Sequence, residues 1–148
     1  GRRIVVFSTL LDHLSTLHRG VVKLGVPGKD IGIYGQATTK AEKAARAKIE
    51  TRKLLFTTYT MMAEGTDFPW LDTCVLAMPR SNVKQAVGRV RRIWPPPEND
   101  HPMQAVYPDK KPPVVMDFVD LDSPVFSGYA QRRGDWYRRI NAEILEVE

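Results

Sequence analysis

Residues 4–24 read IVVFSTLLDHLSTLHRGVVKL, and this stretch decides the class of fold. Its first four residues are all apolar, which is typical of a strand buried on both faces of a parallel sheet. After Ser8 and Thr9, leucine and valine recur at helical spacing over residues 10–24, which predicts an amphipathic helix. A buried strand followed directly by such a helix predicts the start of a βαβ unit.

The same alternation of strand and helix continues along the chain. Further strands are predicted at residues 31–34, 54–58, 73–77 and 114–119, and helices at 41–49 and from 83 to about 92. Thr39 and Glu42 have the spacing of a capping box, and residues 59–67 have room for a short helix and a glycine turn. These elements predict an α/β fold with a mostly parallel sheet covered by helices on both faces. Ligands of such folds meet the carboxyl ends of the strands.

The length of 148 residues corresponds to one domain, residues 1–148. Within it, the proline-rich residues 95–113 lack apolar periodicity and are expected to form a surface loop. Residues 123–148 mix aromatic residues with arginines, and we expect them to form a C-terminal extension that begins as a helix.

Charge and cysteine content narrow the class of partner. The chain has 22 Lys and Arg against 17 Asp and Glu, and the net charge of +5 favours polyanionic partners without requiring them. One cysteine excludes a disulfide framework, and the three histidines lack ligand spacing, so no metal site is expected. The apolar runs are too short to span a bilayer, and the start of the chain lacks the pattern of a signal peptide. We therefore expect an intracellular, reducing compartment (cytoplasm, nucleus or virion) and no membrane partner.

Residues 85–92, QAVGRVRR, are the densest candidate for chemistry. On a helix, Gln85, Gly88, Arg89 and Arg92 fall on one face, where the two guanidiniums form a fork for phosphate oxygens. A glycine inside a helix costs about 1 kcal/mol, so Gly88 suggests that another backbone or a ligand approaches closely. The alternative interpretation is a basic surface helix with a packing glycine.

Residues 64–69, EGTDFP, are the second candidate. Gly65 permits a positive φ, and the Asp67 carboxylate offers an acceptor for a ribose hydroxyl. The alternative interpretation is an ordinary turn in which Gly and Asp have only structural roles.

The two candidate segments follow each other along the chain in the same order as two sequence motifs of one protein family. Residues 58–69, 71–79 and 85–92 resemble motifs V and VI of superfamily-two helicases. Residues 4–9 are similar to motif IV, and Tyr34-Gly35 with the lysine-rich helix after it looks like motif IVa. The resemblance covers about residues 3–119, and the tail looks like the end of phage and large-DNA-virus helicases. It implies the second, C-terminal RecA-like domain, a three-layer sandwich around a mostly parallel sheet.

The resemblance also implies residue roles in binding ATP. Arg92 would be the arginine finger that reaches the γ-phosphate, with Arg89 beside it on the phosphates. Gln85 would link the nucleotide state to the domain interface. Three glycine and aspartate positions would lie at the nucleotide: Gly65, Asp67 and Gly88.

For nucleic acid, DNA or RNA, the resemblance implies contacts with the sugar-phosphate backbone. The residues that match these positions lie at the ends of the first three predicted strands or directly after them: Ser8, Thr9, Gly35 and Thr58. Such contacts supply most of the affinity that does not depend on base sequence.

The sequence contains no Gly-x-x-x-x-Gly-Lys-Ser/Thr phosphate loop and no Asp-Glu pair in a Walker B context. The resemblance implies that ATP and Mg²⁺ are held mainly by an N-terminal RecA-like domain outside this sequence. We therefore expect the second motor domain of an ATP-dependent helicase or translocase, an enzyme part that does not hydrolyse ATP alone. One alternative is a stand-alone nucleic-acid-binding module with the same fold. A further alternative is a generic phosphate-binding α/β domain. The joint presence of motifs IV, V and VI counts against it.

Overall fold

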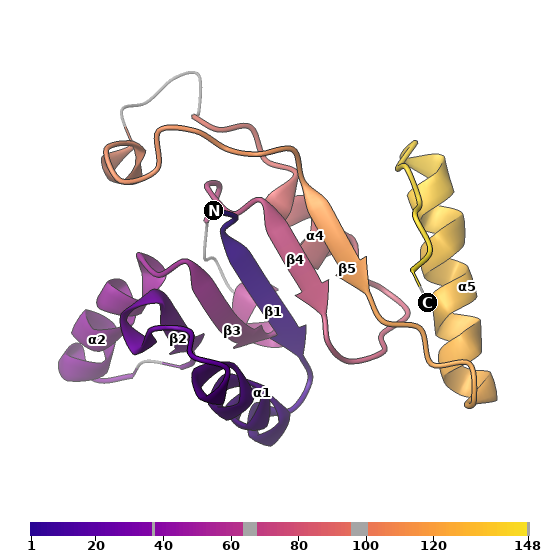
Figure 1. Ribbon diagram of the computed structural model, residues 1–148, viewed down its shortest axis with the longest axis horizontal. Helices are drawn as coiled ribbons and strands as arrows, with labels where there is room; N and C mark the ends of the chain where they lie inside the picture. The colour runs from indigo at the N-terminus through magenta and orange to yellow at the C-terminus, as the bar shows by residue number, and fades with distance from the viewer. Residues whose placement is uncertain (37, 64–67, 96–100, 148) are drawn as a thin grey trace.

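The computed structural model describes residues 1–36, 38–63, 68–95 and 101–147. In these residues strands and helices alternate along the chain (Figure 1). The elements are β1 Ile4–Ser8, α1 Leu11–Lys23, a 3₁₀ turn Gly28–Asp30, β2 Ile31–Tyr34, α2 Lys40–Glu50, β3 Leu54–Thr58, α3 Tyr59–Ala63, β4 Thr73–Leu76, α4 Lys84–Val90, a 3₁₀ turn Pro102–Gln104, β5 Val114–Asp117 and α5 Pro124–Arg139.

The described strands form one five-stranded sheet in the order β2-β3-β1-β4-β5, and every neighbouring pair is parallel. The buried apolar run of residues 4–7 accordingly lies in the central strand, β1, between β3 and β4. Helix α1 packs on one face of the sheet, against a cluster that includes Val6 and Phe56. Helices α2, α3 and α4 pack on the opposite face. The predicted α/β fold with helices on both faces is confirmed.

Local packing explains why two of these elements form where the sequence predicted them. Thr39 and Glu42 make the predicted capping box at the start of α2, with both reciprocal hydrogen bonds present. Gly32 in β2 lies directly under α2, and a Cβ at this position would come 2.4 Å from Ile49 Cγ2. Only glycine therefore lets α2 pack this closely on the edge of the sheet.

Two predicted elements end two residues earlier than expected. The predicted strand at residues 114–119 ends at Asp117, because β5 pairs only with β4, whose last residue, Leu76, is opposite Asp117. The predicted helix from 83 to about 92 spans only Lys84–Val90. Beyond it the chain turns so that Trp94 is buried, and its indole N–H donates to the carbonyl oxygen of Tyr107 at 2.7 Å.

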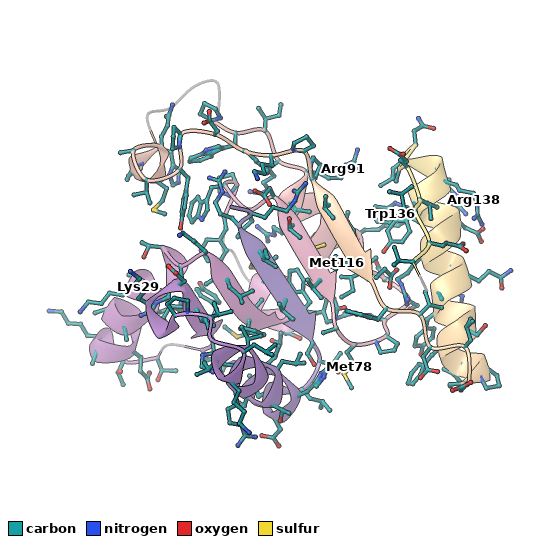
Figure 2. The ribbon with its side chains drawn as sticks, viewed as in Figure 1. Lys29, Met78, Arg91, Met116, Trp136 and Arg138 are labelled. Carbon is teal, nitrogen blue, oxygen red and sulfur yellow. The ribbon has the colours of Figure 1, made fainter. Side chains whose placement is uncertain are left out.

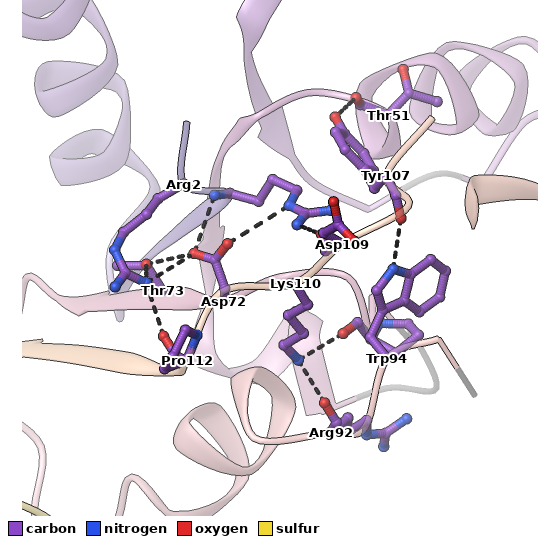
Figure 3. Close-up of polar contacts among 12 residues, drawn as sticks. Arg2, Thr51, Asp72, Thr73, Arg92, Trp94, Tyr107, Asp109, Lys110 and Pro112 are labelled. Carbon is purple, nitrogen blue, oxygen red and sulfur yellow. Dashed lines mark hydrogen bonds and ion pairs between the residues drawn. The ribbon is translucent and has the colours of Figure 1, made fainter. Parts of the chain in front are cut away.

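The described part of the proline-rich segment, residue 95 and residues 101–113, packs on the body of the domain (Figure 3). Arg2 donates to the carbonyl oxygen of Pro112 at 2.9 Å, and the Arg3 guanidinium lies over the Tyr107 ring, 4.7 Å from its centroid. Both arginines also lie within 4 Å of the fully buried Asp72 carboxylate, at 3.5 and 3.7 Å. These contacts fasten the segment to the amino-terminal edge of the sheet, where β1 and β4 begin.

The charge of the C-terminal extension is only partly on the surface. Arg133 of α5 is 2% exposed. Its guanidinium binds Asp117 at the end of β5 through two hydrogen bonds of 2.7 and 2.8 Å and donates to the Arg80 carbonyl oxygen at 2.8 Å. The Arg133 side chain therefore lies inside the domain, because the half-buried Asp117 carboxylate binds its guanidinium.

Candidate nucleotide and nucleic-acid sites

Helix α4 has one buried and one open side. Its buried side is apolar and packs into the core through Ala86, Val87 and Val90. On the other side lies a pocket of about 250 Å³, lined by Gln85, Gly88, Arg89 and Arg92. The structure thus brings together the four residues that the helical spacing placed on one face, although Arg92 lies just beyond the helix end.

Arg89 is anchored across this pocket to the element that precedes residues 64–67. Its guanidinium is half-buried and donates to the carbonyl oxygen of Met62, in α3, at 2.8 Å. A planar, permanently charged group held by a backbone acceptor keeps a fixed orientation. Arg89 thereby connects α4 to α3. Gly65 and Asp67 lie outside the described residues.

Arg92 combines an exposed side chain with a tethered backbone. Lys110, from the proline-rich segment, donates from its ammonium to the carbonyl oxygens of Arg92 and Pro69, both at 2.7 Å (Figure 3). Sequence reasoning missed Lys110, because no pattern in a proline-rich stretch marks one lysine as a tether.

Gly88 lies exposed in the wall of the pocket. Apart from its chain neighbours and the backbone of its own helix, no described atom lies within 4 Å of the position that a Cβ on Gly88 would take. The sequence suggested that another backbone or a ligand approaches Gly88. No described backbone from another element does so. The space beside it is open to a ligand or to another domain.

The candidate nucleic-acid residues lie where strands end. Ser8 and Thr58 are the last residues of β1 and β3 and are opposite each other in the sheet, while Thr9 and Gly35 directly follow β1 and β2. The four positions therefore share the carboxyl edge of the sheet, as the parallel topology requires.

At this edge, all three hydroxyls already have partners, with Thr9 Oγ1 on the Met78 sulfur, and Ser8 and Thr58 are also buried. Ser8 is fully buried, with its Oγ 3.0 Å from His13 Nδ1 and accepting from the Leu10 N–H at 3.2 Å. Thr58 Oγ1 accepts from the Met61 N–H at 3.2 Å and so caps α3. Thr9, by contrast, is exposed. The surface offered to a ligand is therefore Thr9 and the loop backbone more than the Ser8 and Thr58 side chains.

Ionisable groups beneath this edge stay neutral. Burial raises the pKa of the Cys74 thiol to about 12, which makes it a poor nucleophile. Burial also raises the pKa of Tyr59, whose hydroxyl donates to the Met78 carbonyl oxygen at 3.2 Å.

The described residues contain no group of three or more His, Cys, Asp or Glu side chains placed to hold a metal ion. None of the described helices has both the length and the apolar character needed to cross a membrane.

Comparison with known structures identifies the fold. The C-terminal part of the Fun30 ATPase domain superposes with a TM-score of 0.61 at 12% identity, over 99% of this chain and 41% of that one. The C-terminal domain of the DEAD-box protein Dbp5 gives 0.58 at 16% identity, over 90% of this chain and 71% of that one. The chain has the fold of the second RecA-like domain of superfamily-two helicases. The resemblance found in the motifs is thereby confirmed.

A sequence relative of this RecA-like domain agrees with the structural matches. It is the Putative ATP-dependent RNA helicase L396 of Acanthamoeba polyphaga mimivirus, 28% identical over 146 residues. The match covers 97% of this chain but only 25% of that protein, so the chain spans about a quarter of the relative's length. No protein-family model matches the chain.

Proposed function

We propose that this RecA-like domain, residues 1–148, is the second motor domain of an ATP-dependent nucleic-acid helicase or translocase. The observation that carries the proposal is the pocket on α4, where two arginines and an open glycine lie side by side. Guanidiniums in this arrangement fit the phosphates of ATP, and the sequence has no phosphate loop of its own to hold them. The pocket therefore suits the second wall of an ATP site shared between two domains.

Within this proposal, Arg92 is the arginine finger and Arg89 is its companion. Arg92 has an exposed side chain on a tethered backbone, which suits a group that reaches toward another domain. Stabilising transition-state charge in this way is worth about 10³–10⁵ in rate in related NTPases. Gln85 links the nucleotide to the domain interface, and Gly65 and Asp67 lie beside the ribose. ATP and Mg²⁺ are held mainly by an N-terminal RecA-like domain that is the domain's partner.

Nucleic acid is the second proposed ligand, at the carboxyl edge that carries Ser8, Thr9, Gly35 and Thr58. The net charge of +5 supports a polyanionic partner. The curated relative is named an RNA helicase, so RNA is the first ligand to test and DNA the second.

The proposal requires that the isolated 148-residue chain does not turn over ATP. Phosphate release is measured with the chain, ATP, Mg²⁺ and single-stranded RNA or DNA, and no stimulated release is expected. The same assay on the natural protein that also carries a phosphate-loop domain is expected to show hydrolysis that nucleic acid stimulates. Turnover by the chain alone contradicts the proposal. Nucleic-acid binding without hydrolysis in any form supports the alternative, a stand-alone binding module.

A further inference from the structure

A second pocket, of about 290 Å³, lies between α5 and the segment that joins β4 to α4. Helix α5 stands beside β5 at the edge of the sheet, and Trp136 projects from the side of α5 that faces the sheet (Figures 1 and 2). The lining residues are Ser81, Asn82, Val83, Lys84, Arg132, Arg133, Trp136 and Arg139. None of the roles proposed above involves this pocket.

The lining is strongly basic. Lys84, Arg132 and Arg139 are exposed, and no carboxylate is among the lining residues. Among the described residues, none of these three cations has an ion-pair partner, whereas the neighbouring Arg138 pairs with Asp135 at 2.6 Å. Three unneutralised cations around one hollow create a positive potential that favours an anionic ligand.

The pocket is held in shape by buried contacts. Arg133 forms part of its wall, and its charge is neutralised by Asp117. Tyr137 also donates to Asp117, at 2.9 Å, so two side chains of α5 are fixed to the end of β5. The cations on the same helix are therefore presented on a rigid support, which lowers the entropic cost of binding.

A series of contacts connects the wall of this pocket to the carboxyl edge of the sheet. Ser8 and Thr9 both contact the Met78 sulfur, and the next residues along the same loop lead to Arg80. The Arg80 guanidinium lies 4.9 Å from the Tyr59 ring centroid, and its carbonyl oxygen accepts from Arg133. A chain of contacts thus runs from the proposed nucleic-acid edge to the second pocket.

We propose that this pocket binds single-stranded nucleic acid that continues from the carboxyl edge. Lys84, Arg132 and Arg139 hold its phosphates, and the Trp136 ring forms an aromatic wall against which a base packs. Cations interleaved with an aromatic ring are the combination that single-strand sites use. This inference rests on the proposed function, because it extends the path of the same ligand.

The test measures binding of the 148-residue chain to a fluorescently labelled single-stranded RNA or DNA oligonucleotide by anisotropy at several salt concentrations. The double variant Arg132→Ala/Arg139→Ala is expected to bind about 10- to 100-fold more weakly, with a salt slope smaller by about 1.4, because two phosphate contacts are lost. Arg138→Ala, on the same helix but outside the pocket, is the matched control and is expected to bind within about twofold of the parent. Trp136→Phe is expected to retain more affinity than Trp136→Leu, with folding of each variant checked by circular dichroism.

Three outcomes contradict the inference. If Thr9→Asp weakens binding while Arg132→Ala/Arg139→Ala does not, the second pocket is not on the path, and the proposed function stands. If the parent chain binds neither RNA nor DNA, the proposed nucleic-acid partner and this inference fail together. If polyglutamate displaces the oligonucleotide as effectively, charge for charge, as unlabelled RNA does, the pocket recognises acidic protein segments instead.

Discussion

The Lys110 ammonium donates a 2.7 Å hydrogen bond to the carbonyl oxygen of Arg92. Through this bond, a residue of the proline-rich segment holds the backbone from which the proposed arginine finger projects. The same ammonium binds the carbonyl oxygen of Pro69, close to the segment that carries Gly65 and Asp67. The proline-rich segment therefore braces the backbone at Arg92 and at Pro69.

Replacing Lys110 tests this brace. Lys110→Met is expected to lower ATP turnover of the full-length protein by about 10- to 100-fold, because a small displacement of a catalytic group costs that much. Affinity for nucleic acid is expected to change little, since the proline-rich segment is fastened to the amino-terminal edge of the sheet, opposite the carboxyl edge. Lys111→Met, at an exposed neighbouring position, is the control. Equal turnover in the two variants would show that the brace has no functional role.

Replacing Gly88 by alanine is expected to raise the stability of the domain and to lower ATP turnover. Gly88→Ala meets no described atom and adds a better helix former, so it is expected to raise the free energy of unfolding of the chain by up to about 1 kcal/mol. The added methyl group lies in the wall of the α4 pocket, so ATP turnover of the full-length protein is expected to fall. Urea unfolding and phosphate release measure the two effects. Undiminished turnover in a stabilised variant argues against a ligand at this pocket.

The ion pair between buried Arg133 and half-buried Asp117 is expected to contribute most of the attachment of α5. Arg133→Met leaves the Asp117 carboxylate without its charged partner, which is expected to cost about 3–5 kcal/mol of unfolding free energy. Arg138→Met, which removes an exposed ion pair on the same helix, is expected to cost less than about 1 kcal/mol. Chemical denaturation measures the unfolding free energy of both variants. Similar decreases in the two would refute the dominant role of the Arg133–Asp117 pair.

Much of the fold was predictable because parallel strands have a strong signature. The strands at residues 31–34 and 54–58 match β2 and β3, since their apolar, β-branched residues are buried by neighbouring strands and helices. The shortened β5 was not predictable, because the end of an edge strand depends on where its neighbour β4 ends. The burial of Arg133 was not predictable either, because it depends on Asp117, which is 16 residues away in the sequence.

The candidate sites were predictable to different degrees. Helical spacing alone placed Gln85, Gly88 and Arg89 on one face, and the structure places them in one pocket. The strand-end positions of Ser8 and Thr58 also followed from the sequence, but their burial did not. Their hydroxyls bind His13 and the Met61 N–H, contacts that depend on how the helices pack and cap. The roles of all these residues stay predictions.

The start of α2 gives a prediction on pH. Backbone hydrogen bonds from Thr39 and Thr38 lower the pKa of the Glu42 carboxyl from 4.5 to about 2. Because the folded-state pKa is below the unfolded one, the ionised group stabilises α2 above about pH 4.5, and the stabilisation is lost as the pH falls toward 2. The stability difference between the parent and Glu42→Gln is therefore expected to be largest at neutral pH and smaller at pH 3. A difference independent of pH would contradict the capping role.

The central claim is that Arg92 acts on ATP across a domain interface, and neighbouring arginines allow a direct test. Arg91 and Arg92 are both exposed, but only Arg92 lines the α4 pocket. The decisive measurement is nucleic-acid-stimulated ATP hydrolysis by the full-length protein carrying Arg92→Ala or Arg91→Ala, with nucleic-acid affinity measured in parallel. We expect Arg92→Ala to lower hydrolysis by about 10³-fold or more with affinity nearly intact, and the Arg91→Ala protein to hydrolyse ATP close to the parent rate. Hydrolysis that survives in Arg92→Ala while its nucleic-acid affinity falls would contradict the assignment.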